Sequence, residues 1–461
     1  MPPDLALLIW FVLLVFLLYF DPAKERNVSS ALWVPVIWTF FLASRLPSQW
    51  FGVQVSSAAD ALEEGNPIDR TVLSILILTA LLVLLSRRLP WNSLASRNVT
   101  LVTFLAYAML SVCWSDFPLI ALKRWFRDLG DYAMVVVVLT DPHPLEAFRT
   151  FFRRLAYMLV PLCIVLDKYF PIVSKQYDSW TGVGTYAGAT TGKNLLGLLA
   201  MLSALFFLWD TTTHWANRRA RRTKQVLAVN LAFFVMSVSL VRTAESATCR
   251  VCLLLGSLVI LAANSRLFRR NPLVLQILIP ISFCLYVLLA LGMGMSADLA
   301  AAVGKDPTLT ERTRIWSIVL GMKTNPLFGT GYESFWLGRR LEYFWANSGL
   351  GRINEAHNGY LEVYLNLGII GLLILAAFLL AGYRKICRGF NLGSSLGSFH
   401  MAIWVVMLFF CVTEAGFRSG LMWITVLLAT VAVPARAEHA VSDTQAVTDV
   451  ISRKGRLEVI S

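Results

Sequence analysis

The chain has 461 residues, of which 57% are hydrophobic and only 15% are charged. This balance is too apolar for a soluble protein and indicates a membrane protein. The formal net charge of +13 could suggest a nucleic-acid partner, but most of the basic residues fall in turns between apolar runs, where they determine topology. We therefore expect membrane lipids, and no nucleic acid, among its partners.

Apolar runs of membrane-spanning length recur along the whole chain and predict about thirteen candidate spans. The predicted centres lie near Leu13, Ile37, Ile77, Leu105, Val136, Leu162, Met201, Phe233, Leu255, Cys284, Leu372, Met407 and Leu427. The first run has no basic flank and no small-residue cleavage site, so we interpret it as a retained helix. The predicted fold is an all-α polytopic membrane protein with about 12–13 transmembrane helices and one long, partly helical extracytoplasmic loop.

Basic residues recur in alternate turns, and the positive-inside rule places those turns in the cytoplasm. The turns contain Lys24, Arg26, Arg87, Arg88, Arg97, Arg149, Arg153, Arg154, Arg218, Arg219, Arg221, Arg222, Lys224, Arg266, Arg269, Arg270, Arg384, Lys385 and Arg388. The same parity puts the N-terminus outside. It divides the chain into a first bundle (1–296), an extracytoplasmic loop (297–356), a second bundle (357–433) and a cytoplasmic tail (434–461).

Three outward-facing segments before the long loop carry basic residues. Arg124 follows a Trp-Ser-Asp-Phe-Pro run in a predicted outer loop. Because basic residues are normally enriched in cytoplasmic loops, an arginine in an outer loop favours a functional role. Lys193 and Asn194 follow a glycine-rich turn at the start of a helix, where unsatisfied N–H groups attract anions. Arg242 and Arg250 flank a short outer connection; an arginine so close to the membrane is either part of a functional site or extends to the interface.

The predicted outer loop mixes cationic and aromatic side chains. Residues 310–321 predict a short amphipathic helix that contains Arg312 and Arg314 and ends before Asn325-Pro326. Arginine binds phosphate in a bidentate manner, so this loop could hold an anionic glycan or a diphosphate. The alternative is a solvated cap whose aromatic residues anchor it at the lipid interface.

A polar segment, which begins at Glu355, leads directly into a long apolar run and places His357 and Asn358 at the mouth of a span. On a continuous helix, positions 357, 361, 364, 368 and 371 form one stripe. Gly368 and Gly371 on that stripe would let another helix approach closely. We expect a titratable imidazole at the water–lipid boundary.

The chain contains no Asp-x-Asp pair and no HExxH motif. Any reaction at the outer face would then depend on cationic side chains to stabilise a diphosphate leaving group. Cys249 and Cys252 have CxxC spacing, but there is no second pair, so we interpret the cysteines as helix-packing residues. We expect no metal and no cofactor.

These motifs together resemble the O-antigen ligase/polysaccharide polymerase superfamily. The resemblance rests on His357-Asn358 with Gly368 and Gly371, on Trp114-Ser115, on Lys193-Asn194 with Gly197, and on Arg314-Ile-Trp316 followed by Asn325-Pro326 and Gly329-Thr-Gly331. The family's Arg-x-x-x-Leu element is imperfect, because Ile318 follows Arg314 at the leucine position. Either Arg312 or Arg314 is therefore the key cation of the loop.

The resemblance implies a metal-independent, inverting glycosyltransferase of the bacterial inner membrane whose site faces the periplasm. The donor would be a glycan linked to undecaprenyl diphosphate, and the acceptor another glycan or lipid A–core. His357 would act as general base, with Arg314, Arg250 and Arg242 neutralising the diphosphate. The other expected substrate-binding residues are Arg312, Lys193, Asn194, Asn358 and Arg124. Ligase and polymerase activities both fit. The alternatives are a membrane transporter and a non-catalytic component of polysaccharide assembly.

Overall fold

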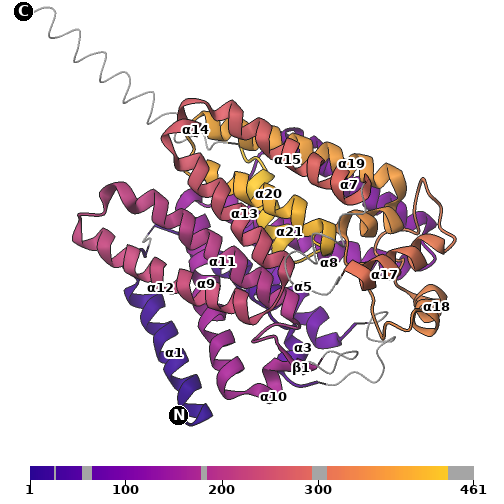
Figure 1. Cartoon of the computed structure of the whole chain (residues 1–461), viewed down its shortest axis with the longest axis horizontal. Coiled ribbons are helices and arrows are strands. Elements are labelled where there is room, and N and C mark those ends of the chain that lie inside the picture. The colour runs from indigo at the N-terminus through magenta and orange to yellow at the C-terminus, as the bar shows by residue number, and fades with distance from the viewer. Residues whose placement is uncertain (25–26, 54–64, 178–183, 293–308, 435–461) are drawn as a thin grey trace, which may run out of the picture.

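The structure is a computed structural model that describes residues 1–24, 27–53, 65–177, 184–292 and 309–434. Within these ranges the regular structure is helical apart from one two-stranded antiparallel hairpin (Figure 1). The predicted boundary at 296/297 and the tail from 435 onwards lie outside the described residues. The all-α membrane fold class is confirmed.

The helices of the first half are α1 (Pro3–Phe20), η1 (Ser30–Leu32), α2 (Trp33–Ala43), α3 (Pro47–Trp50), α5 (Pro67–Ser86), α6 (Trp91–Arg97), α7 (Val99–Leu110), η2 (Ser111–Trp114), α8 (Pro118–Leu139), α9 (Pro144–Tyr169) and α10 (Pro171–Ser174). The hairpin, β1 (Lys175–Tyr177) and β2 (Gly184–Tyr186), follows. The remaining helices are α11 (Lys193–His214), η3 (Trp215–Asn217), α12 (Arg221–Thr243), α13 (Ala247–Asn264), α14 (Arg266–Arg270), α15 (Pro272–Gly292), α17 (Leu309–Gly321), α18 (Gly338–Ser348), α19 (Gly359–Asn391), α20 (Gly397–Thr413) and α21 (Leu421–Thr430).

Every predicted span centre falls within one of these helices, but not all of the helices are long and apolar. In the described chain, seven are long and apolar enough to cross a membrane, and eight if the bent pair around residue 98 forms one span. Helices α8 and α9 are long but charged, whereas α2, α20 and α21 are short. The sequence-based number of 12–13 therefore exceeds the number that meets both criteria.

The centre of the bundle is formed by α11 and α20. In the apolar 18-residue stretch of α11, 78% of the residues are buried. In the corresponding stretches of α1, α5 and α15 only 11–17% are buried, and apolar side chains are exposed around most of the helix surface. Helix α13 packs between α11 and α20, and α19 packs on the other side of α20. Rings of Phe152, Phe206 and Phe399 interlock in this core. A rigid centre therefore supports the ends of α11 and α20.

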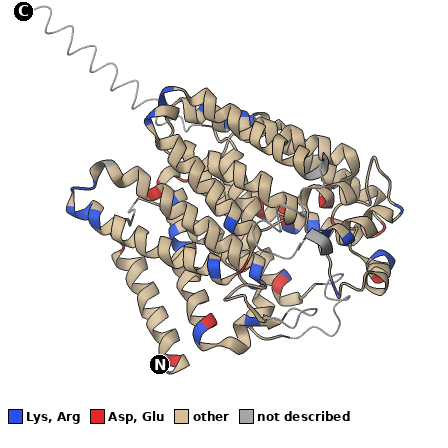
Figure 2. Ribbon diagram, viewed as in Figure 1, with Lys and Arg blue, Asp and Glu red and all other residues tan. Residues whose placement is uncertain are grey.

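The segments predicted to lie outside gather at one end of the bundle. Helices α17 and α18 lie opposite the α11–α12 turn and α14 (Figure 1). Lysine and arginine residues lie in that turn and in α14 (Figure 2). Arg222 Nε donates to the carbonyl of Pro22 at 3.0 Å, so two predicted cytoplasmic turns meet there. Which compartment each end faces stays a prediction.

The predicted basic turn around Arg153 is instead part of a long helix. Arg149, Arg153 and Arg154 lie in the first half of α9, and Arg153 is almost fully buried. Its guanidinium lies 2.5 Å from Asp210 of α11 and 2.8 Å from the amide oxygen of Asn230 of α12. A charge buried at this depth needs such partners. These contacts connect α9, α11 and α12.

The predicted continuous stripe from 357 to 371 is wrong. Helix α19 begins at Gly359, and Gly368 interrupts it with φ +67° and ψ −168°. A Cβ at Gly368 would lie 2.2 Å from the carbonyl oxygen of Leu327. The close approach at this glycine is therefore made by the loop 326–331, whose backbone bonds to α19: Thr330 N donates to Leu365 O at 3.0 Å, and Ile369 N to Pro326 O at 2.9 Å.

Candidate active site

A pocket of about 660 Å³ opens at the end of the bundle where α17 and α18 lie. This volume is within the range of small-molecule sites. Its walls come from the hairpin, the start of α11, the segment before α19 and the loop between α20 and α21. The charged lining residues are Lys193, Glu355, His357, Glu414 and Arg418.

The backbone of His357 adopts the left-handed region, with φ +48°. A residue other than glycine persists there only when its surroundings impose the conformation. On the C-terminal side, the Asn358 side chain caps α19 by accepting from Leu361 N at 3.0 Å. The predicted substrate-binding residue Asn358 therefore has a structural function in this state.

On the N-terminal side, the preceding residue, Ala356, is held through both its carbonyl and its N–H. Trp316 of α17 donates its indole N–H to the carbonyl of Ala356 at 2.8 Å, and the N–H of Ala356 donates to the carboxylate of Glu362. Glu362 also accepts from the indole of Trp336, at 3.0 and 3.1 Å. Ala356 is fully buried. The imidazole is therefore presented from a fixed backbone.

Two carboxylates face the imidazole. His357 Nδ1 lies 2.9 Å from Glu355 Oε1 and 3.6 Å from Glu414 Oε2. In this state the ring nitrogen is not aligned as a hydrogen-bond donor to either oxygen. Burial by itself lowers the pKa of His357, but the two carboxylates outweigh it and raise that pKa to about 10. In this state, at neutral pH, the ring is an imidazolium.

Glu414 joins three segments at this point. Its Oε1 accepts from Arg312 Nη2 of α17 at 2.7 Å and from Asn194 Nδ2 of α11 at 2.9 Å. The Glu414 side chain is only 7% exposed. Its carboxylate is thus neutralised by one guanidinium and one imidazolium, and each is a cation that could instead face a diphosphate.

Arg418, four residues further on, connects the pocket to a buried network behind it. Its guanidinium lies 3.7 Å from Glu355 Oε2 and 3.1 Å from Glu333 Oε2. Burial raises the pKa of Glu355, but His357 and the arginines outweigh it and lower that pKa to about 2. Glu355 therefore remains ionised beside the imidazole.

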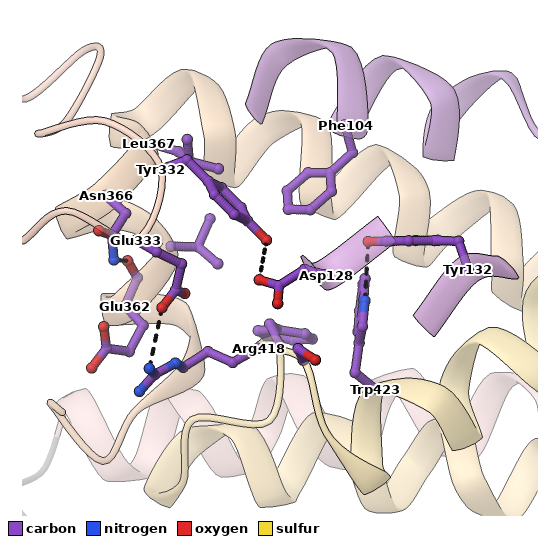
Figure 3. Close-up of a pocket in the computed structure, with 13 residues that line it drawn as sticks. Phe104, Asp128, Tyr132, Tyr332, Glu333, Glu362, Asn366, Leu367, Arg418 and Trp423 are labelled. Carbon is purple, nitrogen blue, oxygen red and sulfur yellow. Dashed lines mark hydrogen bonds and ion pairs between the residues drawn. The ribbon is translucent and has the colours of Figure 1, made fainter. Parts of the chain in front are cut away.

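Behind Arg418 is a small cavity of about 30 Å³, which has room for about one water molecule (Figure 3). Asp128 accepts from the hydroxyl of Tyr332 at 2.9 Å at its edge. The guanidinium of Arg124 donates to the backbone carbonyl of Glu333. Arg124, predicted as a substrate-binding residue, thus reaches the pocket through Glu333 and Arg418 and does not line it.

The structure brings four of the predicted residues together: His357, Lys193 and Asn194 line the pocket, and Arg312 reaches it through its contact with Glu414. Arg314 is exposed on α17, outside the pocket lining. Arg242 and Arg250 are also exposed outside it, and Arg250 Nη2 donates to the carbonyl of Arg242 at 3.1 Å.

Sequence reasoning missed Glu414 and Arg418. Both lie in the short connection between α20 and α21, two strongly apolar helices. Ionisable side chains inside such a hydrophobic stretch are functional candidates by default, so this signal could have identified them.

Glu355, His357 and Glu414 have ligand atoms within 4.8 Å of one another, a spacing that could hold a metal ion. Each of them already has a counter-charge, however. A cation would have to displace the proton of His357 and compete with Arg312 for Glu414. The donor set therefore fits an ion-pair network better than a metal site.

Comparison with known proteins gives two matches. Residues 227–376 match the family described as O-antigen ligase. The chain is also 27% identical over 315 residues to exopolysaccharide production protein ExoQ of Rhizobium meliloti (strain 1021), which covers 66% of this chain and 68% of that protein. The resemblance inferred from the motifs is confirmed. Lys193, Glu414 and Arg418 lie outside residues 227–376.

Replacing Trp316 with phenylalanine tests whether the hydrogen bond to Ala356 positions His357. The ring is retained, but a buried carbonyl loses its donor, which costs about 1–3 kcal/mol locally. We expect the turnover number for the chain's reaction to fall about tenfold while KM changes little, as measured by steady-state kinetics in detergent or liposomes.

Trp345→Phe is the matched control. Trp345 also donates its indole N–H to a backbone carbonyl, that of Ile353, at 2.8 Å. It should lose similar stability in a thermal unfolding assay and keep its turnover. Equal losses of turnover in the two variants would mean that Trp316 has only a structural role.

Proposed function

We propose that this chain, whose residues 227–376 match the O-antigen ligase family, transfers a glycan from undecaprenyl diphosphate to a hydroxyl of an acceptor sugar. The family match suggests glycan transfer in polysaccharide synthesis and implies lipid-linked glycan substrates. The observation that carries the specific proposal is the pocket itself, where His357 and Glu414 lie beside Arg312 and Lys193. A proton acceptor and cations for a diphosphate are thus side by side.

The proposed reaction is a single displacement with inversion. The acceptor oxygen attacks the anomeric carbon, the bond from that carbon to the diphosphate oxygen breaks, and undecaprenyl diphosphate leaves. The hydroxyl proton passes to the base, a step worth about 10²–10⁴-fold in rate. Arg312 and Lys193 would stabilise the charge that grows on the diphosphate. No step requires a metal ion.

His357 is the proposed base, but it must first lose the proton that the two carboxylates hold on it. The second candidate is the Glu414 carboxylate, with His357 acting as a fixed positive charge. The separation of 3.6 Å between His357 Nδ1 and Glu414 Oε2 supports both assignments. They differ in the pH at which the base is available.

The acceptor is proposed from the relative. That protein functions in exopolysaccharide production, which favours a growing exopolysaccharide glycan over lipid A–core. A transporter would place its polar residues near mid-membrane. Here the pocket lies at one end of the bundle, which favours an enzyme over a transporter.

Reconstitution tests the proposed activity. Purified protein in liposomes receives a labelled undecaprenyl-diphosphate glycan and each acceptor in turn, and the products are separated by size. We expect transfer by the wild type, with or without a chelator, and no transfer by His357→Ala protein that is present in the liposomes in equal amount. Undiminished transfer by the variant would exclude a catalytic role for His357, and inhibition by the chelator would contradict the metal-independent route.

Alanine at Arg312 and at Arg314 separates the two candidate cations. Arg312 contacts Glu414 in the pocket wall, whereas Arg314 is exposed. We expect Arg312→Ala to lower transfer about 10²–10³-fold, as loss of a transition-state stabiliser does, and Arg314→Ala to have an effect below about threefold. Arg312→Lys should recover only part of the rate, because lysine lacks the planar fork. The reverse ranking would assign the diphosphate to Arg314.

The pH dependence of kcat/KM separates the two bases. If neutral His357 is the base, the rate falls as pH drops below its raised pKa of about 10, so kcat/KM should rise steadily from pH 6.5 to 9.5. Glu355→Gln removes one carboxylate and lowers the pKa of His357. The rise in kcat/KM should therefore move toward pH ~6.5 in this variant. If kcat/KM is constant from pH 6 to 9 in both proteins, Glu414 is the base that accepts the hydroxyl proton.

A further inference from the structure

The β1–β2 hairpin forms one wall of the pocket, and its described lining residues carry no charge. Gln176 and Thr185 line the pocket with His357 and Glu414, and they are direct cross-strand partners in the hairpin register. Directly opposite residues of an antiparallel pair project to the same face. The pocket face of the hairpin therefore presents one amide and one hydroxyl.

The other face of the hairpin has a different character. Lys175 pairs with Tyr186 in the register, and the Lys175 ammonium lies 5.4 Å from the ring centroid of Tyr177, a residue that also lines the pocket. Neither Lys175 nor Tyr186 lines the pocket in the described chain. The Tyr186 hydroxyl can therefore serve as an internal control.

The hairpin is anchored at both of its feet. Arg45 donates from Nη2 to the carbonyl of Val173 at 2.7 Å, just before β1, and from Nε to that of Thr190 at 3.2 Å, after β2. Asp167 of α9 accepts from Gly188 N at 2.9 Å. The amide of Gln176 donates to Thr191 O at 2.9 Å, which fixes its orientation. Groups held in this way are suited to recognition, because little ordering remains to be done on binding.

The chemistry of this wall differs from that of the rest of the pocket. Among the described lining residues, the charged ones come from the start of α11, the segment before α19 and the α20–α21 loop. A diphosphate would be held by those cations. The Thr185 hydroxyl donates to Gln176 O at 3.4 Å and the Gln176 amide to Thr191 O. Their oxygens can still accept, and the amide has a second N–H, so both groups can bond to sugar hydroxyls.

We infer that the pocket face of the hairpin, Gln176 with Thr185, is a carbohydrate subsite that binds an uncharged sugar ring next to the bond being made. The inference rests on the proposed function for the reaction that the sugar undergoes. The class of ligand, an uncharged sugar, is argued from the hairpin residues themselves. The ring could belong to the donor glycan or to the acceptor glycan. Kinetics with the two substrates varied separately distinguish these sources.

The test variant is Thr185→Val, which removes the hydroxyl and keeps the β-branched shape that suits a strand. Thr185→Ser restores the hydroxyl, and Tyr186→Phe removes a hydroxyl from the opposite face of the same hairpin. We expect Thr185→Val to raise KM for one glycan substrate about 3- to 10-fold, the value of one hydrogen bond, with kcat within about twofold of the wild type. Thr185→Ser and Tyr186→Phe should behave as the wild type.

A rise in KM for the acceptor alone assigns the subsite to the acceptor, and a rise for the donor alone assigns it to the donor. Unchanged KM values for Thr185→Val, or an equal change in Tyr186→Phe, would overturn the inference. Gln176→Leu provides a second variant in case Thr185→Val does not fold, as judged by size-exclusion chromatography, and is held to the same criteria.

Binding without turnover separates this inference from the proposed reaction. The probe is the repeat-unit oligosaccharide released by mild acid from the host's polyprenyl-linked glycan, titrated into the full-length protein in detergent. His357→Ala should bind it as the wild type does, and Thr185→Val should bind it 3- to 10-fold more weakly. If the wild type transfers no glycan but this difference persists, the proposed reaction is wrong and the subsite stands. If transfer proceeds and the difference is absent, the subsite is wrong.

Discussion

The pocket depends on the ion pairs of one buried carboxylate, that of Glu414. Arg312 and Asn194 bind one of its oxygens, and His357 faces the other. A buried carboxylate without partners is costly, so α11, α17 and the start of α19 must all converge on the end of α20. The charges that this junction requires for stability are also those that the proposed transfer uses. We infer that folding and chemistry share the same residues here.

Loop residues usually lack the rigidity that general-base catalysis requires, and the structure supplies it through backbone contacts. The loop 326–331 pairs with α19 around Gly368, where no side chain would fit. The indole of Trp316 and the carboxylate of Glu362 hold the peptide before His357. The strained backbone at His357 is therefore imposed by its neighbours, as expected where strain is retained at a functional position.

Charged residues within the long helices α8 and α9 account for part of the difference between the predicted and observed numbers of apolar spans, and the short helices α2, α20 and α21 for another part. Helix α9 carries Arg153, which is buried against Asp210 and Asn230. Helix α8 carries Asp128, which accepts from Tyr332 behind the pocket. Hydropathy scores each residue separately and takes no account of such pairing. The two networks lie toward opposite ends of the bundle.

The sequence by itself determined the membrane class, the helix positions and part of the site. Apolar run length and motifs such as His357-Asn358 and Lys193-Asn194 are properties of contiguous residues, and those residues were identified. A distinction between Arg312 and Arg314 was not possible, because positions two apart on a helix point to different faces and either face could be the inner one.

Only the tertiary structure decided which face of α17 turns inward and which distant residues complete the pocket. Arg312 lies 102 positions before Glu414, and Asn194 lies 220 positions before it. Contacts over such separations depend on how the helices pack, and no local pattern records that packing. The same holds for the hairpin wall, whose register brings Gln176 and Thr185 onto one face. Local chemistry could thus be read from the sequence, and its assembly into one pocket could not.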